Sequence, residues 1–161
     1  MEKSKKKLSI SNIIYYLVVI LFIMTLALLV SSKSQLAYNI VGYRTYTILS
    51  GSMEPTYYPG DLVVVKNKKR SNLEKDDVIT FVDDGEIITH RIIDKTNEGY
   101  QTKGDNNNVE DATILTESDI IGEVKFKIPK AGYVIQFLSR KSVVALELIL
   151  LGAFVLLYNR D

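Results

Sequence analysis

Two long apolar runs, one near each end of this chain, limit what it can fold into more than any other feature. The first, residues 13–30, reads IIYYLVVILFIMTLALLV and contains no charged residue. A helix needs roughly 20 such residues to cross the hydrocarbon core of a bilayer, and the run reaches that length with Ser31 and Ser32. The sequence therefore predicts a transmembrane signal anchor over residues 13–32.

Lysines are concentrated before this run, at positions 3, 5, 6 and 7. Basic residues beside a span favour the cytoplasmic side, so residues 1–12 are expected to form a basic cytoplasmic N-terminus. A cleaved signal peptide also has a basic start and an apolar stretch. The run is long for a signal peptide, and small residues are not cleanly placed after it, so the pattern favours an uncleaved anchor.

The second apolar run, residues 143–158, reads VVALELILLGAFVLLY and is interrupted by Glu147. A carboxylate at the centre of a span costs about 3 kcal/mol, which the leucines partly offset. An amphipathic or buried helix that packs on the domain is the alternative. We expect a second transmembrane helix here, with residues 159–161 as a cytoplasmic tail and residues 33–142 on the extracytoplasmic side of the cell membrane.

Between the two runs, short β-branched and aromatic stretches alternate with turn residues, and helical periodicity of useful length is absent from residues 43–127. The triplet Asp83-Asp84-Gly85 separates two such stretches and predicts a hairpin. The sequence therefore predicts a mainly β fold, a small antiparallel β domain between two transmembrane helices. The expected strands are 44–49, 61–66, 77–82, 86–93, 100–103 and 120–126.

Two further segments permit two interpretations each. Residues 66–75 (KNKKRSNLEK) are most simply a solvated loop, with binding to anionic lipid as the alternative. The apolar stretch 133–138 fits either a membrane interface or a packed strand or linker.

Composition excludes several classes of function. The chain has no cysteine, which rules out disulfides, thiolate metal sites and cysteine nucleophiles. A single histidine also argues against a transition-metal site, and nothing in the sequence calls for a cofactor. The net charge of +1 gives no reason to expect nucleic acid as a partner.

The parts needed for nucleophilic acyl transfer are all present. A serine hydroxyl needs a general base, and a histidine, with an unperturbed pKa of ~6.5, suits that role when a carboxylate orients it. Ser52 lies in the Gly- and Pro-flanked segment SGSMEPT, His90 in ITHRII, and Asp105 in KGDNN, followed by Asp111. Each piece alone is weak evidence, since such turns are common and a lone histidine on a strand is more often structural. Their order and context carry the argument.

Five ordered motifs resemble those of the type I signal peptidases, in detail the endoplasmic-reticulum and archaeal branch that also occurs in Gram-positive sporulating bacteria. They are SGSMEPT at 50–56, GDLVVV at 60–65, DDVITF at 76–81, ITHRII at 88–93 and TKGDNN at 102–107. Agreement of five motifs by chance is far less plausible than agreement of one. The resemblance covers roughly residues 48–130, and nearly the whole chain once the terminal runs are included.

The resemblance implies a role for each matching position. The nucleophile falls on Ser52 and the general base on His90, where the typical bacterial branch has a lysine. Asp111 matches the acid of the triad, and Asp105 would support the site by hydrogen bonding, although the reverse assignment stays open. Glu110 stands where relatives often have another aspartate. The Ser50 hydroxyl and the Ser52 backbone N–H would form the oxyanion hole.

The implied reaction is cleavage of one peptide bond in a secretory preprotein through a Ser52 acyl-enzyme. The family's substrates carry small residues at −1 and −3 and bind as an extended strand against a β edge. The lipid bilayer is the second expected partner, and the protein translocation machinery is a further one that the resemblance leaves open.

Two other functions fit parts of the sequence. A self-cleaving Ser/Lys protease related to the SOS-response repressors shares the fold, but it would use a lysine base instead of His90. An inactive or accessory membrane scaffold would have lost a catalytic position, whereas Ser52, His90, Asp105 and Asp111 are all retained. Signal peptide cleavage is the function that we expect.

Overall fold

The computed structural model describes residues 10–33, 35–70 and 72–158, and the chain divides into two compact units. The helical unit comprises residues 1–30 and 135–161, and the β unit comprises residues 31–134. The expected tail at 159–161 and most of the basic N-terminus lie outside the described residues.

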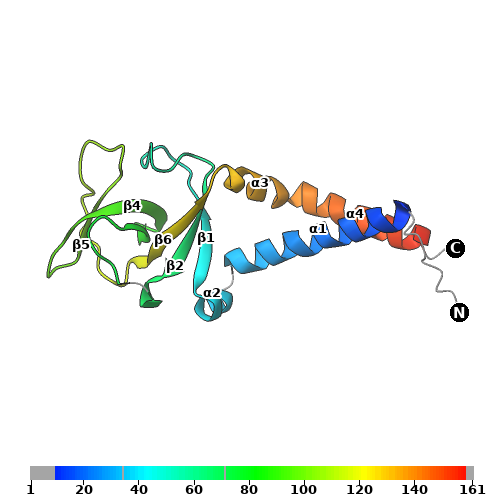
Figure 1. Cartoon of the computed structure of the whole chain (residues 1–161), viewed down its shortest axis with the longest axis horizontal. Coiled ribbons are helices and arrows are strands. Elements are labelled where there is room, and N and C mark those ends of the chain that lie inside the picture. The colour runs from blue at the N-terminus through cyan, green and yellow to red at the C-terminus, as the bar shows by residue number, and fades with distance from the viewer. Residues whose placement is uncertain (1–9, 34, 71, 159–161) are drawn as a thin grey trace, which may run out of the picture. The chain divides into compact units, whose positions relative to one another are not determined.

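The β unit is built on one antiparallel sheet with the strand order β1-β2-β6-β3-β4-β5 (Figure 1). This confirms the predicted antiparallel β domain, and each predicted strand matches an observed one, with ends that differ by a few residues. The strands are β1 (Tyr43–Thr47), β2 (Leu62–Asn67), β3 (Val78–Asp83), β4 (Glu86–Lys95), β5 (Tyr100–Lys103) and β6 (Ile120–Ile128).

The hairpin between β3 and β4 shows how the local sequence determines the sheet. Asp83 pairs with Glu86, which leaves a two-residue loop. Both loop residues have positive φ, 47° at Asp84 and 82° at Gly85. A two-residue loop with positive φ at both positions matches the right-handed twist of the flanking strands, and the Asp-Gly pair favours it. The predicted hairpin is confirmed, and it sets the register of β4.

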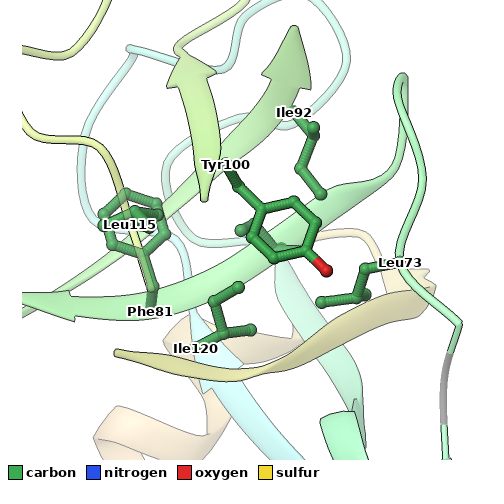
Figure 2. Close-up of a cluster of buried hydrophobic side chains, with 7 residues drawn as sticks. Leu73, Phe81, Ile92, Tyr100, Leu115 and Ile120 are labelled. Atoms are coloured by element: carbon green, nitrogen blue, oxygen red, sulfur yellow. The ribbon is translucent and has the colours of Figure 1, made fainter. Parts of the chain in front are cut away.

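Two hydrophobic clusters hold the β unit together. The first contains Leu73, Ile79, Phe81, Ile92, Tyr100, Leu115 and Ile120, most of which are labelled in Figure 2. The second contains Ile48, Met53, Val63, Val65, Val78 and Val124. The first cluster fixes β4 against β3 and β5, and the second reaches beyond the sheet into the loop that follows β1.

Two segments outside the strands differ from simple loops. Residues 131–138 form the helix α3 (Ala131–Leu138), so the segment 133–138 is not a strand, and its place at a membrane interface stays a prediction. Lys130 has a φ of 59°, which ends the extended run of β6, and the Gly132 N–H donates to Gly60 O at 2.9 Å. The charged segment 66–75 contains a short 3-10 helix, η1 (Lys68–Arg70). A further helix, α2 (Gln35–Val41), precedes β1.

The helical unit contains most of α1 (Ile10–Lys33) and all of α4 (Lys141–Tyr158). A hydrogen bond of 3.3 Å from Thr25 Oγ1 to Glu147 Oε1 joins the two helices. Both apolar runs are thus helical, as the sequence predicts. Among the described residues, however, no helix meets the length and apolar character required to cross a membrane, so the two expected spans are not supported.

Candidate active site

Ser52 lies in the loop that leaves the sheet after β1. Ile48 and Met53 on either side of it are buried in the second hydrophobic cluster. The base of the loop is closed by two backbone hydrogen bonds, from Ile48 N to Asp61 O at 2.9 Å and from Gly60 N to Ile48 O at 2.8 Å. Because the loop is anchored at its base and by Met53, it holds the half-buried Ser52 side chain at a defined position.

His90 lies on β4 and directs its ring toward Ser52. Its Nε2 atom is 3.1 Å from Ser52 Oγ, within hydrogen-bond reach. The residue is only 7% exposed, and the ring packs edge-on against Phe81 with centroids 6.2 Å apart. The register of the β3–β4 hairpin therefore places the imidazole, and the apolar neighbour limits its rotation.

The other ring nitrogen of His90 faces Asp111. Nδ1 and Asp111 Oδ2 are 2.7 Å apart, and the same carboxylate oxygen accepts from Thr102 Oγ1 at 2.6 Å. Gln101 Nε2 donates to the Asp111 carbonyl at 2.6 Å, which fixes the backbone as well. An ionised carboxylate only accepts hydrogen bonds, so Nδ1 carries the proton in this contact and Nε2 is left to accept from the Ser52 hydroxyl.

Asp105 does not pair with His90 but with Arg91 and Thr56. Its carboxylate accepts from Arg91 Nε at 2.8 Å and Arg91 Nη2 at 2.7 Å, and from Thr56 Oγ1 at 2.5 Å. The hydrogen bonds from Arg91 hold the pKa of Asp105 below its ordinary value, and Asp105 in turn raises the pKa of Arg91. The network links β4 to the loop of Ser52 through Thr56. Of the two aspartates, the hydrogen-bonded partner of His90 is therefore Asp111.

Glu110, the third carboxylate considered from the sequence, is exposed and lines a separate depression with Asp94 and Gln101. Within the described residues, no group of three or more His, Asp or Glu side chains is arranged to hold a metal ion.

The turn at residues 104–107 is hydrogen-bonded to the backbone around Ser52. Asn106 N donates to Ser52 O at 2.8 Å, and Asn106 Nδ2 donates to Gly51 O at 3.1 Å. A Cβ atom on Gly104 would lie 2.6 Å from Ser52 O, closer than real Cβ contacts allow. The turn therefore approaches the serine loop as closely as a glycine permits. This contact accounts for the Gly and Asn of the KGDNN motif.

Ser50, expected to contribute to an oxyanion hole, lies next to the serine. Its Oγ is 3.2 Å from Ser52 Oγ, and either hydroxyl can be the donor. The residue is exposed, so its hydroxyl is free to turn toward a ligand.

A groove of about 360 Å³ opens at Ser52 and His90. One side is formed by residues 47–50 with Ser52 and Met53, and the other by residues 86–90, with Asn107 as a further lining residue. The lining is largely apolar or uncharged. Residues 86–90 belong to the strand β4, and residues 48–53 belong to the loop after β1.

Sequence reasoning did not identify Arg91, Thr56, Thr102, Gln101 and Asn106 as site residues. Thr56 lies within SGSMEPT, Arg91 within ITHRII, and Thr102 and Asn106 within TKGDNN, so position in a motif was the available signal for these four. Gln101 lies outside the motifs, and its contact with Asp111 depends on the folded chain.

Comparison with known proteins finds relatives that are peptidases by name. A family model described as Peptidase S24-like matches residues 36–125. Signal peptidase I W of Bacillus subtilis is 37% identical over 128 residues, which cover 74% of this chain and 67% of the relative. The signal peptidase complex catalytic subunit SEC11 of Zygosaccharomyces rouxii is 36% identical over 127 residues, covering 70% and 76%. The catalytic subunit SEC11C of Homo sapiens is 30% identical over 125 residues, covering 68% and 65%.

Proposed function

The chain belongs to the signal peptidase I family of S24-like peptidases and is a peptidase of that kind, and we propose that it removes N-terminal signal peptides from secretory preproteins with Ser52 as nucleophile. The observation that carries the proposal is the chain of contacts from Ser52 Oγ to His90 Nε2 at 3.1 Å and from His90 Nδ1 to Asp111 Oδ2 at 2.7 Å.

In the first half of the reaction, Ser52 Oγ attacks the scissile carbonyl carbon while its proton passes to His90 Nε2. Asp111 stabilises the imidazolium that forms and keeps the ring in the productive tautomer. Collapse of the tetrahedral intermediate breaks the C–N bond, and His90 returns the proton to the leaving amine. Water then attacks the Ser52 ester, with His90 as base, and releases the signal peptide with a free carboxylate.

The developing negative charge on the carbonyl oxygen needs donors beside Ser52. The Ser52 backbone N–H and the Ser50 hydroxyl are suitably close, and we assign them to the oxyanion hole. Removal of one such donor typically lowers kcat by about 10²–10³-fold.

The groove suits the substrates of this family. An extended segment with small side chains at −1 and −3 would lie between residues 47–50 and 86–90, with its main chain bonded to the walls. Met53 and Ile88 are among the residues that line the groove, and we assign them to the limit on side-chain size at −1 and −3.

The self-cleaving Ser/Lys mechanism is less well supported. The nitrogen base bonded to Ser52 Oγ is His90 Nε2. In addition, the relatives named as signal peptidases match over two thirds or more of this chain. The retained triad contacts also favour an active enzyme over a scaffold.

We also propose that the helical unit attaches the enzyme to a bilayer. Many large apolar side chains on α1 and α4 are exposed, among them Ile13, Leu17, Ile20, Leu148 and Ile149. An apolar surface of this extent is typical of a lipid- or protein-binding face. Attachment would raise the local concentration of membrane-bound substrate at the groove. The two-span arrangement, with residues 33–142 outside the cytoplasm, stays a prediction that protease protection in sealed vesicles would test.

The catalytic assignment is tested by incubation of the reconstituted full chain with a preprotein, followed by mass spectrometry of the products and of the acid-quenched enzyme. A mature product that starts directly after a small residue, together with a signal-peptide ester on Ser52, is the expected result. A cut at scattered positions or an adduct on another residue would contradict it.

A further inference from the structure

Glu86 is the only carboxylate among the described residues that line the groove, and the lining contains no lysine or arginine. A single fixed charge in an otherwise uncharged groove discriminates between charged ligands, because it attracts one sign and repels the other. No function described above uses Glu86.

The position of Glu86 on β4 determines which part of a substrate it meets. Residues i, i+2 and i+4 of a strand share one face, so Glu86, Ile88 and His90 lie on the same face of β4. At roughly 3.3 Å per residue, Glu86 lies about 13 Å along the strand from His90. An extended substrate that runs beside β4 repeats with the same spacing. A substrate bound with its residue −1 at His90 and its N-terminal end toward the β3–β4 turn would place residue −3 at Ile88 and residue −5 at Glu86.

The carboxylate of Glu86 is available to a ligand. Among the described residues, the salt bridges are His90–Asp111, Arg91–Asp105 and Lys125–Glu123, so Glu86 is in none of them. The residue is exposed and begins β4 directly after the hairpin turn. Asp83 and Asp84 of the same hairpin add negative charge beside it.

We propose that Glu86 is a specificity-determining residue that favours a substrate with Lys or Arg at position −5 and disfavours one with Asp or Glu there. This inference rests on the proposed function, because it assumes that the residues before the cleavage site occupy the groove. An ion pair at an exposed site is screened by water and salt, so the effect is a moderate bias in kcat/KM.

The test uses the full chain in liposomes and one preprotein that carries Lys, Gln or Glu at −5. Wild type is expected to cleave the Lys substrate about two- to fivefold more efficiently than the Gln substrate, and the Glu substrate less efficiently by a similar factor. The preference should shrink in high salt. Glu86→Gln should abolish the preference, and Glu86→Lys should reverse it.

Two controls make the result specific. Asp84→Asn removes the same charge from the same hairpin but at a position outside the groove lining, so it should retain the preference of the wild type. The same substitutions at −4, on the opposite face of the substrate strand, should have little effect.

The outcomes separate this inference from the proposed function. Cleavage of all three substrates with equal efficiency, or a preference that survives Glu86→Gln, would overturn the role of Glu86 and leave the peptidase function intact. Failure of wild type to cleave any of them would overturn both.

Discussion

His90 Nδ1 lies 2.7 Å from Asp111 Oδ2, although Asp105 belongs to the more prominent sequence motif. The two aspartates have separate partners: Asp111 contacts the imidazole, and Asp105 receives a bidentate pair from Arg91. This division predicts different consequences when either charge is removed.

Asp111→Asn should lower kcat by about 10³–10⁴-fold, because the amide cannot hold the imidazole in the tautomer that accepts the Ser52 proton. The side chain keeps its size, so the far-ultraviolet circular dichroism and the melting temperature should stay close to those of wild type. Asp105→Asn is the matched control and should have the smaller effect on kcat. If Asp105→Asn proves the more damaging to kcat, the assignment of the triad acid is wrong.

Asp105 should instead influence stability at low pH. Because Arg91 holds the pKa of Asp105 below its ordinary value of 3.8, the ionised form stabilises the fold above that pH, and this contribution is lost as the pH falls through the folded-state pKa. At neutral pH, Asp105→Asn should cost about 1 kcal/mol, a value reduced by partial solvent screening.

Urea unfolding of inactive Ser52→Ala, with and without Asp105→Asn, measures this effect between pH 7 and pH 3. The single variant should lose stability more steeply below pH 4 than the double variant. Parallel curves for the two proteins would count against the Arg91–Asp105 pair as a source of acid sensitivity.

Gly104→Ala should displace the serine loop, since the added Cβ would lie 2.6 Å from Ser52 O. A shift of about 1 Å in the nucleophile costs roughly 100-fold in turnover, so we expect that loss in kcat with a smaller change in KM. Gly152→Ala provides the control, because a Cβ there has nothing within 4 Å, and it should leave kcat unchanged. Unaltered turnover in Gly104→Ala would show that the turn at 104–107 does not position Ser52.

The hydrogen bond between Thr25 and Glu147 predicts that substitutions at the two positions have coupled effects on the stability of the helical unit. The two residues are only 3% and 6% exposed, and Glu147 Oε2 is buried without a hydrogen-bond partner among the described residues. Thr25→Val leaves the carboxyl without its donor and should destabilise the helix pair by about 1–2 kcal/mol.

Glu147→Leu removes the buried polar group and should be neutral or stabilising, and the double variant should resemble it. Loss of the helical circular dichroism signal on heating in detergent measures all three variants. Additive effects of the two substitutions would mean that the pair is not coupled.

The β unit was predictable because its signals are local. The Asp84-Gly85 turn defines the β3–β4 hairpin, and short runs of β-branched and aromatic residues between turn residues mark the neighbouring strands. The pairing of Ser52 with His90 was predictable from motif order. The partners of Asp105 were not, since Arg91 and Thr56 meet it only after β4 and the serine loop have packed together.

The helices were less predictable from the sequence than the strands. The run at 133–138 is too short to be told from a strand by its apolar residues alone, and the start of α3 is joined to the chain after the serine loop by a hydrogen bond from Gly132 N to Gly60 O. The apolar runs at 13–30 and 143–158 predict helices correctly from composition, but composition does not determine how those helices meet a bilayer.

We propose that Ser52 and His90 act together as nucleophile and base, and the most direct test is cleavage of a membrane-inserted preprotein by liposome-reconstituted wild type, Ser52→Ala and His90→Ala. Wild type is expected to make one cut after a small residue, and both variants are expected to lose that cut with their folding intact. Cleavage that survives in His90→Ala, or no cleavage by wild type, would contradict it.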